Sequence, residues 1–226
     1  MTIGLILLAG LAGASVPAAG APAVAAVPAS PDWTQQVEVT EEGGYRMGNP
    51  DAPLKLVEFL STTCGHCADF AEAAMPALRE QVRAGRISIE YRNYVLNHYD
   101  VAAAMLSRCA PTSRYFELTD ALLARQDEWV GKAERLTPAQ RARIEVQPTR
   151  DSVALTWDLL GLTPIAGAYG ITASTCLADN RRLAQLFGMA EAAERLGVQG
   201  TPTFMLNGRV IGAHDWSTLQ PYLGQP

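Results

Sequence analysis

Residues 57–67 read VEFLSTTCGHC, a short apolar run followed closely by two cysteines, Cys64 and Cys67, with Gly65 and His66 between them. A close cysteine pair of this kind can hold a metal ion, cross-link the fold or carry out redox chemistry. The residues on either side of the pair, and the rest of the chain, favour one of these three uses.

The segment around the pair predicts a strand followed by a helix. LKLVEFLS, which begins at Leu54, has the length and bulk of a short buried strand. After the cysteines, apolar residues recur at helical spacing as far as Gly85, and Pro76 inside this pattern predicts a kink because the pattern continues beyond it. The first cysteine therefore lies where a strand turns into a helix.

Two further regions carry strand patterns. RISIEYRNYVL (86–96) predicts a second strand, so the first part of the chain forms a strand–helix–strand unit. TPTFMLNGRVIGA (201–213) predicts two strands joined at Asn207-Gly208, a strong hairpin signal. Between them, apolar stripes at helical spacing predict a helical block. The two strand-bearing parts can share one sheet only if this block is an insertion.

The composition of the chain excludes some classes of binding partner and indicates its cellular compartment. The chain has 226 residues, a formal net charge of −5 and no run of Lys or Arg. Nucleic acid and anionic membrane surfaces attract clustered positive charge, so neither is expected as a partner. Residues 1–31 carry no charged side chain, and Ile3 to Val16 has the length of a signal-peptide core, although no Lys or Arg follows Met1. We interpret 1–31 as a signal peptide and an Ala/Pro-rich linker, which predicts export.

Export changes how the cysteines are interpreted. Four cysteines allow three pairings, and an oxidising compartment keeps disulfides intact. Zinc would need two more ligands, and no second close-spaced pair of Cys or His offers them. A purely structural disulfide across two residues would close a ring too small to stabilise the fold much. Redox chemistry is therefore the favoured use of the pair.

The position at a helix start gives Cys64 its expected chemistry. Unpaired backbone N–H groups and the helix dipole favour a thiolate there, and His66 adds a nearby donor and, when protonated, a positive charge. A stabilised thiolate stabilises the reduced protein, which makes the disulfide a good oxidant. Cys67, one turn into the helix, is the expected resolving thiol.

VEFLSTTCGHC, followed far downstream by GTPTF (200–204), resembles the thioredoxin superfamily. The helical insertion and the exported start make the chain similar to the DsbA-like periplasmic thiol–disulfide oxidoreductases, and RNYVLN (92–97) is similar to that family's strand after the active-site helix. The resemblance covers about residues 44–223. It implies an α/β thioredoxin fold, in which a mixed central sheet is flanked by helices and carries a large inserted helical subdomain.

The same resemblance implies a division of the chain. Residues 32–99 form the first half of the thioredoxin domain and contain CGHC, 100–187 form the helical insertion, and 188–226 form the second half with the Thr-Pro loop. The interpretation of 1–31 as signal peptide and linker places them before this domain.

Roles for single residues follow from the resemblance. Cys64 corresponds to the nucleophile and Cys67 to the resolving cysteine. Pro202 corresponds to a cis-proline that faces the pair and leaves Thr201 backbone groups free to bind an extended substrate, the alternative being an ordinary trans-proline. Glu58 corresponds to a buried acid that exchanges a proton with Cys67, the alternative being a solvated strand glutamate.

The other two cysteines, Cys109 and Cys176, lie towards opposite ends of the helical block. If Cys64 pairs with Cys67, they are left to pair with each other in a structural disulfide that closes a long loop. The alternative is two free buried thiols.

The resemblance implies an enzyme that donates its Cys64–Cys67 disulfide to unfolded or reduced exported proteins in the periplasm. A quinone-linked membrane partner would recharge it, and we expect a monomer with no cofactor and no metal. The Gly-His dipeptide differs from the Pro-His of the family's namesake and also occurs in disulfide isomerases, which leaves an isomerase or reductase open. A non-catalytic peptide-binding module that uses the Thr201-Pro202 groove is a further alternative.

Overall fold

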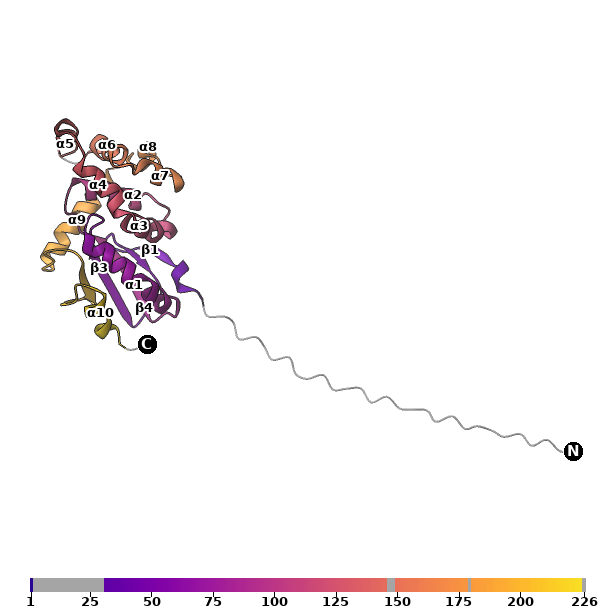
Figure 1. Cartoon of the computed structure of the whole chain (residues 1–226). Coiled ribbons are helices and arrows are strands. Elements are labelled where there is room, and N and C mark those ends of the chain that lie inside the picture. Colours follow the sequence, from indigo (N-terminus) through magenta and orange to yellow (C-terminus); the bar gives the residue numbers. More distant parts are fainter. Residues whose placement is uncertain (2–30, 146–148, 179, 225–226) are drawn as a thin grey trace. The chain divides into compact units, whose positions relative to one another are not determined.

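The computed structural model describes Met1 and residues 31–145, 149–178 and 180–224 (Figure 1). The signal peptide and linker expected at 1–31 therefore lie almost wholly outside the described residues and stay a prediction. Residues 31–226 form one compact unit. Among the described residues, no helix combines the length and the apolar character needed to span a bilayer.

Within the described residues, a six-stranded mixed sheet forms the centre of this unit, in the order β1-β2-β4-β3-β5-β6. β3 and β4 are parallel, and the other neighbouring strands pair antiparallel. The strands are β1 (Val37–Val39), β2 (Tyr45–Met47), β3 (Leu54–Leu60), β4 (Ile87–Asn93), β5 (Thr203–Leu206) and β6 (Arg209–Ile211).

Strands from both ends of the chain lie side by side in this sheet. β3 precedes the helical block and β5 follows it, yet the two strands pair with Glu58 opposite Phe204. The helical block is therefore an insertion between two halves of one sheet. This confirms the predicted fold class, a mixed sheet flanked by helices with a large helical insertion.

Helices cover the sheet and build the insertion. α1 (Gly65–Arg83) follows β3, α9 (Arg181–Arg195) precedes β5, and α10 (Trp216–Leu223) follows the hairpin. In Figure 1, α4 to α8 gather at the end of the unit away from α10. The remaining helical elements are η1 (Trp33–Gln35), α2 (His98–Arg108), η2 (Thr112–Arg114), α3 (Tyr115–Ala124), α4 (Gln126–Glu134), α5 (Pro138–Ile144), α6 (Arg150–Leu160), α7 (Thr163–Ala168) and α8 (Ala173–Cys176).

β3 is buried on both faces, and this arrangement positions the acid beneath the cysteines. Leu56 and Leu60 belong to the core that β3 shares with α1, whereas Val57 and Phe59 pack with residues of α9. Successive side chains of a strand point to opposite faces. Glu58 therefore points to the α1 side of the sheet, together with Leu56 and Leu60.

Several details differ from the sequence-based expectations. The sequence patterns do not predict β1, β2 or α10, and the strand predicted over 86–96 ends at Asn93. The insertion was expected to end at residue 187, but α9 runs unbroken across this position. Ala193 of α9 packs with Val57 and Phe59 of β3, and the division of the chain at residue 187 stays a prediction.

Candidate active site

Cys64 lies where β3 gives way to α1. It is the N-cap residue of α1, with an extended backbone (φ −85°, ψ 118°), and its side chain is partly exposed. Cys67 lies in the first turn of α1 and is fully buried. Both side chains are free thiols, so the structure represents the reduced protein.

The Thr201-Pro202 loop contacts the nucleophile from the other half of the fold. The Thr201-Pro202 peptide bond is cis. The Cys64 thiol donates a hydrogen bond to the Thr201 carbonyl oxygen over 3.2 Å. Sheet pairing of β3 with β5 thus brings together residues that are 137 positions apart in the chain.

Hydrogen bonds lower the pKa of the Cys64 thiol from its usual 9.0 to about 5. The largest contribution is the hydrogen bond from the Cys67 side chain, and desolvation acts against it. The Thr201 hydroxyl and the backbone N–H groups of Cys67 and His66 lower the pKa further. Among the described residues, the Thr201 hydroxyl has no hydrogen-bond partner while Cys64 is a thiol, and the thiolate offers it one.

Part of this lowering of the Cys64 pKa is predicted by the sequence. The N–H groups at the helix start act as expected, but His66 contributes through its backbone N–H. The contributions of the Cys67 and Thr201 side chains were missed. A resolving cysteine that also stabilises the nucleophile has no signature in the CxxC spacing, because it depends on how the two sulfurs face each other.

The pKa values of Cys67 and Glu58 are raised, in contrast to the lowered pKa of Cys64. Burial raises the pKa of the Cys67 thiol, and the hydrogen bond with Cys64 and the negative charge of Glu58 add to the rise. Burial, followed by the charges of Asp120 and Cys64, raises the pKa of Glu58 well above its usual 4.5. Glu58 is 1% exposed and neither carboxylate oxygen has a hydrogen-bond partner among the described residues, so it is not the solvated strand glutamate of the alternative.

A groove of about 730 Å³ runs beside the cysteine pair. Phe70, Pro202 and Trp216 supply apolar surface, and His66 and Thr201 lie next to them. The groove is open and adjoins Thr201, whose carbonyl oxygen is already within hydrogen-bond distance of Cys64.

The described residues contain no group of three or more His, Cys, Asp or Glu side chains placed to hold a metal ion.

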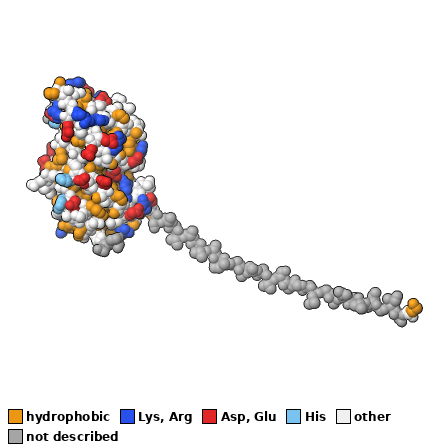
Figure 2. All heavy atoms as spheres, in the orientation of Figure 1, with side chains coloured by type: hydrophobic (Ala, Val, Ile, Leu, Met, Phe, Trp, Pro, Cys, Tyr) orange, Lys and Arg blue, Asp and Glu red, His pale blue; other side chains and the backbone are white. Residues whose placement is uncertain are grey.

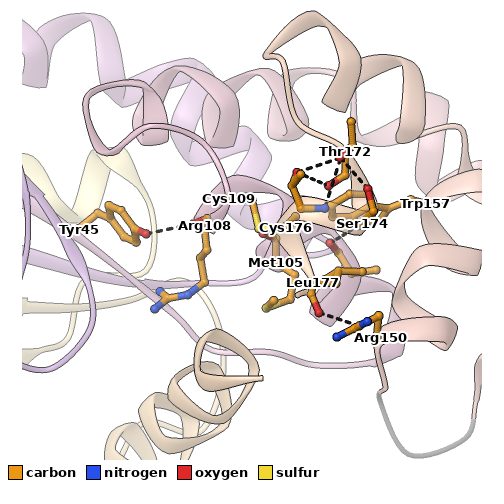
Figure 3. The surroundings of a disulfide bond; sticks show 12 residues. Tyr45, Met105, Arg108, Cys109, Arg150, Trp157, Thr172, Ser174, Cys176 and Leu177 are labelled. Carbon is orange, nitrogen blue, oxygen red and sulfur yellow. Dashed lines mark hydrogen bonds between the residues drawn. A yellow bond between two sulfur atoms is a disulfide. The ribbon is translucent and has the colours of Figure 1, made fainter. Parts of the chain in front are cut away.

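Cys109 and Cys176 form a disulfide inside the insertion (Figure 3). Their Cα atoms are 5.4 Å apart, and the bond links the end of α2 to α8. Met105 and Leu177 lie beside it in the insertion's core. These cysteines are therefore paired with each other and are not the two free thiols of the alternative.

Comparison with known proteins agrees with this geometry. A sequence model of the family described as "Thioredoxin" matches residues 40–225. The crystal structure of a protein-disulfide isomerase from Novosphingobium aromaticivorans superposes with a TM-score of 0.74 at 33% identity, covering 79% of this chain and 94% of that one.

Two further relatives extend the comparison. The crystal structure of alpha-DsbA1 from Wolbachia pipientis superposes with a TM-score of 0.62 over 80% of this chain and 88% of that one, and at 22% identity it supports the fold alone. An inferred protein-disulfide oxidoreductase of Rickettsia bellii is 31% identical over 91 residues, which are 39% of this chain. That match spans only 35% of the Rickettsia protein.

Proposed function

The chain belongs to the thioredoxin family, and on that premise we propose that it is a thiol–disulfide oxidoreductase of the DsbA-like type that oxidises other proteins through Cys64 and Cys67. The observation that carries the proposal is the opposite behaviour of the two thiols. The pKa of Cys64 is lowered to about 5, whereas burial raises that of Cys67. One sulfur is therefore a stable leaving group at neutral pH and the other is not.

The reaction begins with the Cys64–Cys67 disulfide. A substrate thiolate attacks the Cys64 sulfur, the Cys64–Cys67 bond breaks, and the Cys67 sulfur takes up a proton as it leaves, because its thiolate is unstable in the buried site. A second substrate thiolate then attacks the substrate sulfur of the mixed disulfide and releases Cys64 as a thiolate. The substrate loses two electrons and gains a disulfide, and the protein gains both electrons as two reduced cysteines.

Each neighbouring residue has a defined part in this scheme. Glu58, which lies beneath the pair with a raised pKa, supplies the proton to Cys67 and removes it in the reverse direction. The N–H of His66 and the hydroxyl of Thr201 hold the negative charge of Cys64. The groove beside Pro202 and the Thr201 backbone bind the substrate peptide in an extended form.

The direction of the reaction separates two roles. The low pKa of Cys64 favours the reduced protein and therefore an oxidase. The second candidate is a disulfide isomerase or reductase, because the Novosphingobium relative is a protein-disulfide isomerase. The peptide groove also suits a binding module in which the cysteines take no part, but a lowered Cys64 pKa has no use there.

The setting of the reaction is part of the proposal. The substrates are reduced or unfolded exported proteins, the compartment is the periplasm, and a quinone-linked membrane partner restores the disulfide. On the face shown in Figure 2, acidic and basic side chains are interspersed, which suits varied protein substrates better than a polyanion. The protein acts as a monomer.

Equilibration with glutathione tests the proposal. We expect an oxidising potential for the Cys64–Cys67 couple and rapid oxidation of a reduced, unfolded substrate, whereas Cys64→Ser is inactive. A thioredoxin-like potential, together with refolding of a scrambled substrate, would indicate the isomerase or reductase. A wild-type protein as inactive as Cys64→Ser would leave only the binding module.

A further inference from the structure

The segment from Thr62 to the nucleophile Cys64 is hydrogen-bonded by side chains of the helical insertion. Asp100 in α2 is fully buried, as is Thr62. One Asp100 carboxylate oxygen accepts hydrogen bonds from the Thr62 N–H (2.8 Å) and the Thr62 hydroxyl (2.5 Å). The other oxygen accepts one from the N–H of Leu96 over 2.9 Å. Burial raises the pKa of the Asp100 carboxyl, and these hydrogen bonds act against the rise because they stabilise the ionised form, which can only accept.

Gln126, the first residue of α4, holds the same segment from the other side. Its side-chain nitrogen donates to the carbonyl oxygens of Thr62 (2.9 Å) and Cys64 (3.0 Å), which uses both of its hydrogens. Gln126 is 8% exposed, so water competes little for these bonds. Thr62 is thus bound at its N–H and hydroxyl by Asp100 and at its carbonyl by Gln126.

The Cys64 carbonyl links this contact to the reactive sulfur. The same oxygen accepts the first hydrogen bonds of α1, from the N–H groups of Cys67 (3.1 Å) and Ala68 (3.2 Å). Fixing that carbonyl fixes the plane of the Cys64-Gly65 peptide, because the peptide group is rigid. The hydrogen bonds to this oxygen tie it to the first turn of α1, and the His66 and Cys67 N–H groups of that turn are the ones that lower the Cys64 pKa.

We propose that Gln126 and Asp100 are positioning residues through which the helical insertion sets the reactivity of Cys64, by holding Thr62 to Cys64 so that the N–H groups at the start of α1 face the sulfur. This rests on the proposed function, because the reactivity matters only if Cys64 exchanges disulfides. The insertion thereby does more than enlarge the fold: it keeps the nucleophile ready to ionise.

The test compares three variants of the full chain. Gln126→Leu removes both donors at similar volume, and Asp100→Asn keeps the shape but turns one acceptor into a donor. Thr156→Val is the matched control, because Thr156 is equally buried in the insertion and its hydroxyl bonds the Ser152 carbonyl over 2.7 Å, within α6. The readouts are the pH dependence of Cys64 alkylation and the equilibrium constant with glutathione.

We expect Gln126→Leu and Asp100→Asn each to raise the Cys64 pKa by about one unit. Each should also shift the glutathione equilibrium about tenfold, or about 30 mV, towards a more reducing couple. Thr156→Val should lower stability without moving either readout. If Gln126→Leu does not fold, Gln126→Met tests the same loss of donors with an unbranched side chain.

Two results would overturn the inference. One is a wild-type Cys64 pKa in folded variants at both positions, and the other is an equal shift in Thr156→Val. Alkylation reports ionisation whether or not the protein exchanges disulfides. A wild type that is inactive towards glutathione would therefore sink the proposed function while the pKa comparison still decides the positioning role.

Discussion

Ionisation of Cys64 couples pH to the stability of the reduced protein. Its pKa is about 5 in the fold and 9.0 for an ordinary cysteine, so between these values the unfolded chain holds a proton that the folded protein has released. The unfolding free energy of the reduced protein therefore rises with pH across this window, and the gain is lost as pH falls through about 5.

In the oxidised protein Cys64 carries no ionisable thiol. The unfolding free energy of the reduced form, minus that of the oxidised form, should therefore increase as pH is raised from 5 towards 9. Guanidinium unfolding of both forms across this range measures it, with reduced Cys64→Ser as the control that lacks the slope. A difference that stays constant with pH would contradict the assigned ionisation.

Glu58 makes stability depend on pH in the opposite direction to Cys64, because its pKa is raised in the folded protein. Above pH 4.5 the unfolded chain releases a proton that the folded protein keeps, so the wild type loses stability as pH rises towards the folded pKa. Glu58→Gln removes that loss, since a neutral amide is cheaper to bury than a carboxylate. We expect the variant to be more stable than the wild type near neutral pH and to show no advantage in acid.

The same variant should slow the attack of Cys67 on a trapped mixed disulfide, because the base that removes its proton is gone. Urea unfolding and the release rate of a labelled mixed disulfide give the two readouts. Glu58→Gln with an unchanged release rate would remove Glu58 from the mechanism while leaving the stability argument in place.

At the level of elements, the turn between β5 and β6 does more than reverse the chain. Asn207 has a positive φ of 48°, and its side-chain oxygen accepts from the Lys55 N–H over 2.8 Å while its side-chain nitrogen donates to the Pro53 carbonyl over 3.2 Å. The turn therefore secures the start of β3. Asn207→Ala should lower the unfolding free energy by about 2 kcal/mol, from lost hydrogen bonds and an unfavourable φ.

Asn207→Gly separates the two causes, because glycine tolerates the positive φ but makes no side-chain bonds. We expect it to be intermediate in chemical denaturation, with the Cys64 alkylation profile unchanged in both variants. Equal stability of the alanine variant and the wild type would show that the turn tolerates other geometries.

Elements with a pattern of their own could be predicted, and those made by distant contacts could not. The strand and helix around Cys64 show clear hydrophobic periodicity, and the Asn207-Gly208 dipeptide predicts the hairpin. β1 and β2 are three residues each and exist through pairing, with Tyr45 of β2 opposite Tyr91 of β4. The hydrogen bond from Gln126 to Thr62 joins residues 64 positions apart, so no local sequence pattern predicts it.

At the scale of the whole molecule, the insertion is cross-linked within itself and bonded to the sheet at the active site. The Cys109–Cys176 disulfide closes a loop of 67 residues that includes α4, the helix carrying Gln126. Cys176 belongs to the insertion's own core, together with Met105, Trp157 and Leu186, rather than to the core beneath Cys64. The two disulfides of the oxidised protein therefore have separate surroundings and separate roles.

Replacing both structural cysteines, in Cys109→Ala/Cys176→Ala, should lower the unfolding free energy by up to about 4 kcal/mol, because the unfolded chain regains the freedom of the closed loop. The Cys64 alkylation profile should stay at its wild-type value while the protein is folded, since packing and the Gln126 hydrogen bonds still orient α4. Guanidinium unfolding and alkylation measure the two effects.

In the oxidised wild type, a mild reductant should open Cys64–Cys67 first, because Cys176 is only 3% exposed. A non-reduced digest measures this. If the Cys109–Cys176 peptide disappears at the same reductant concentration, burial does not protect this bond.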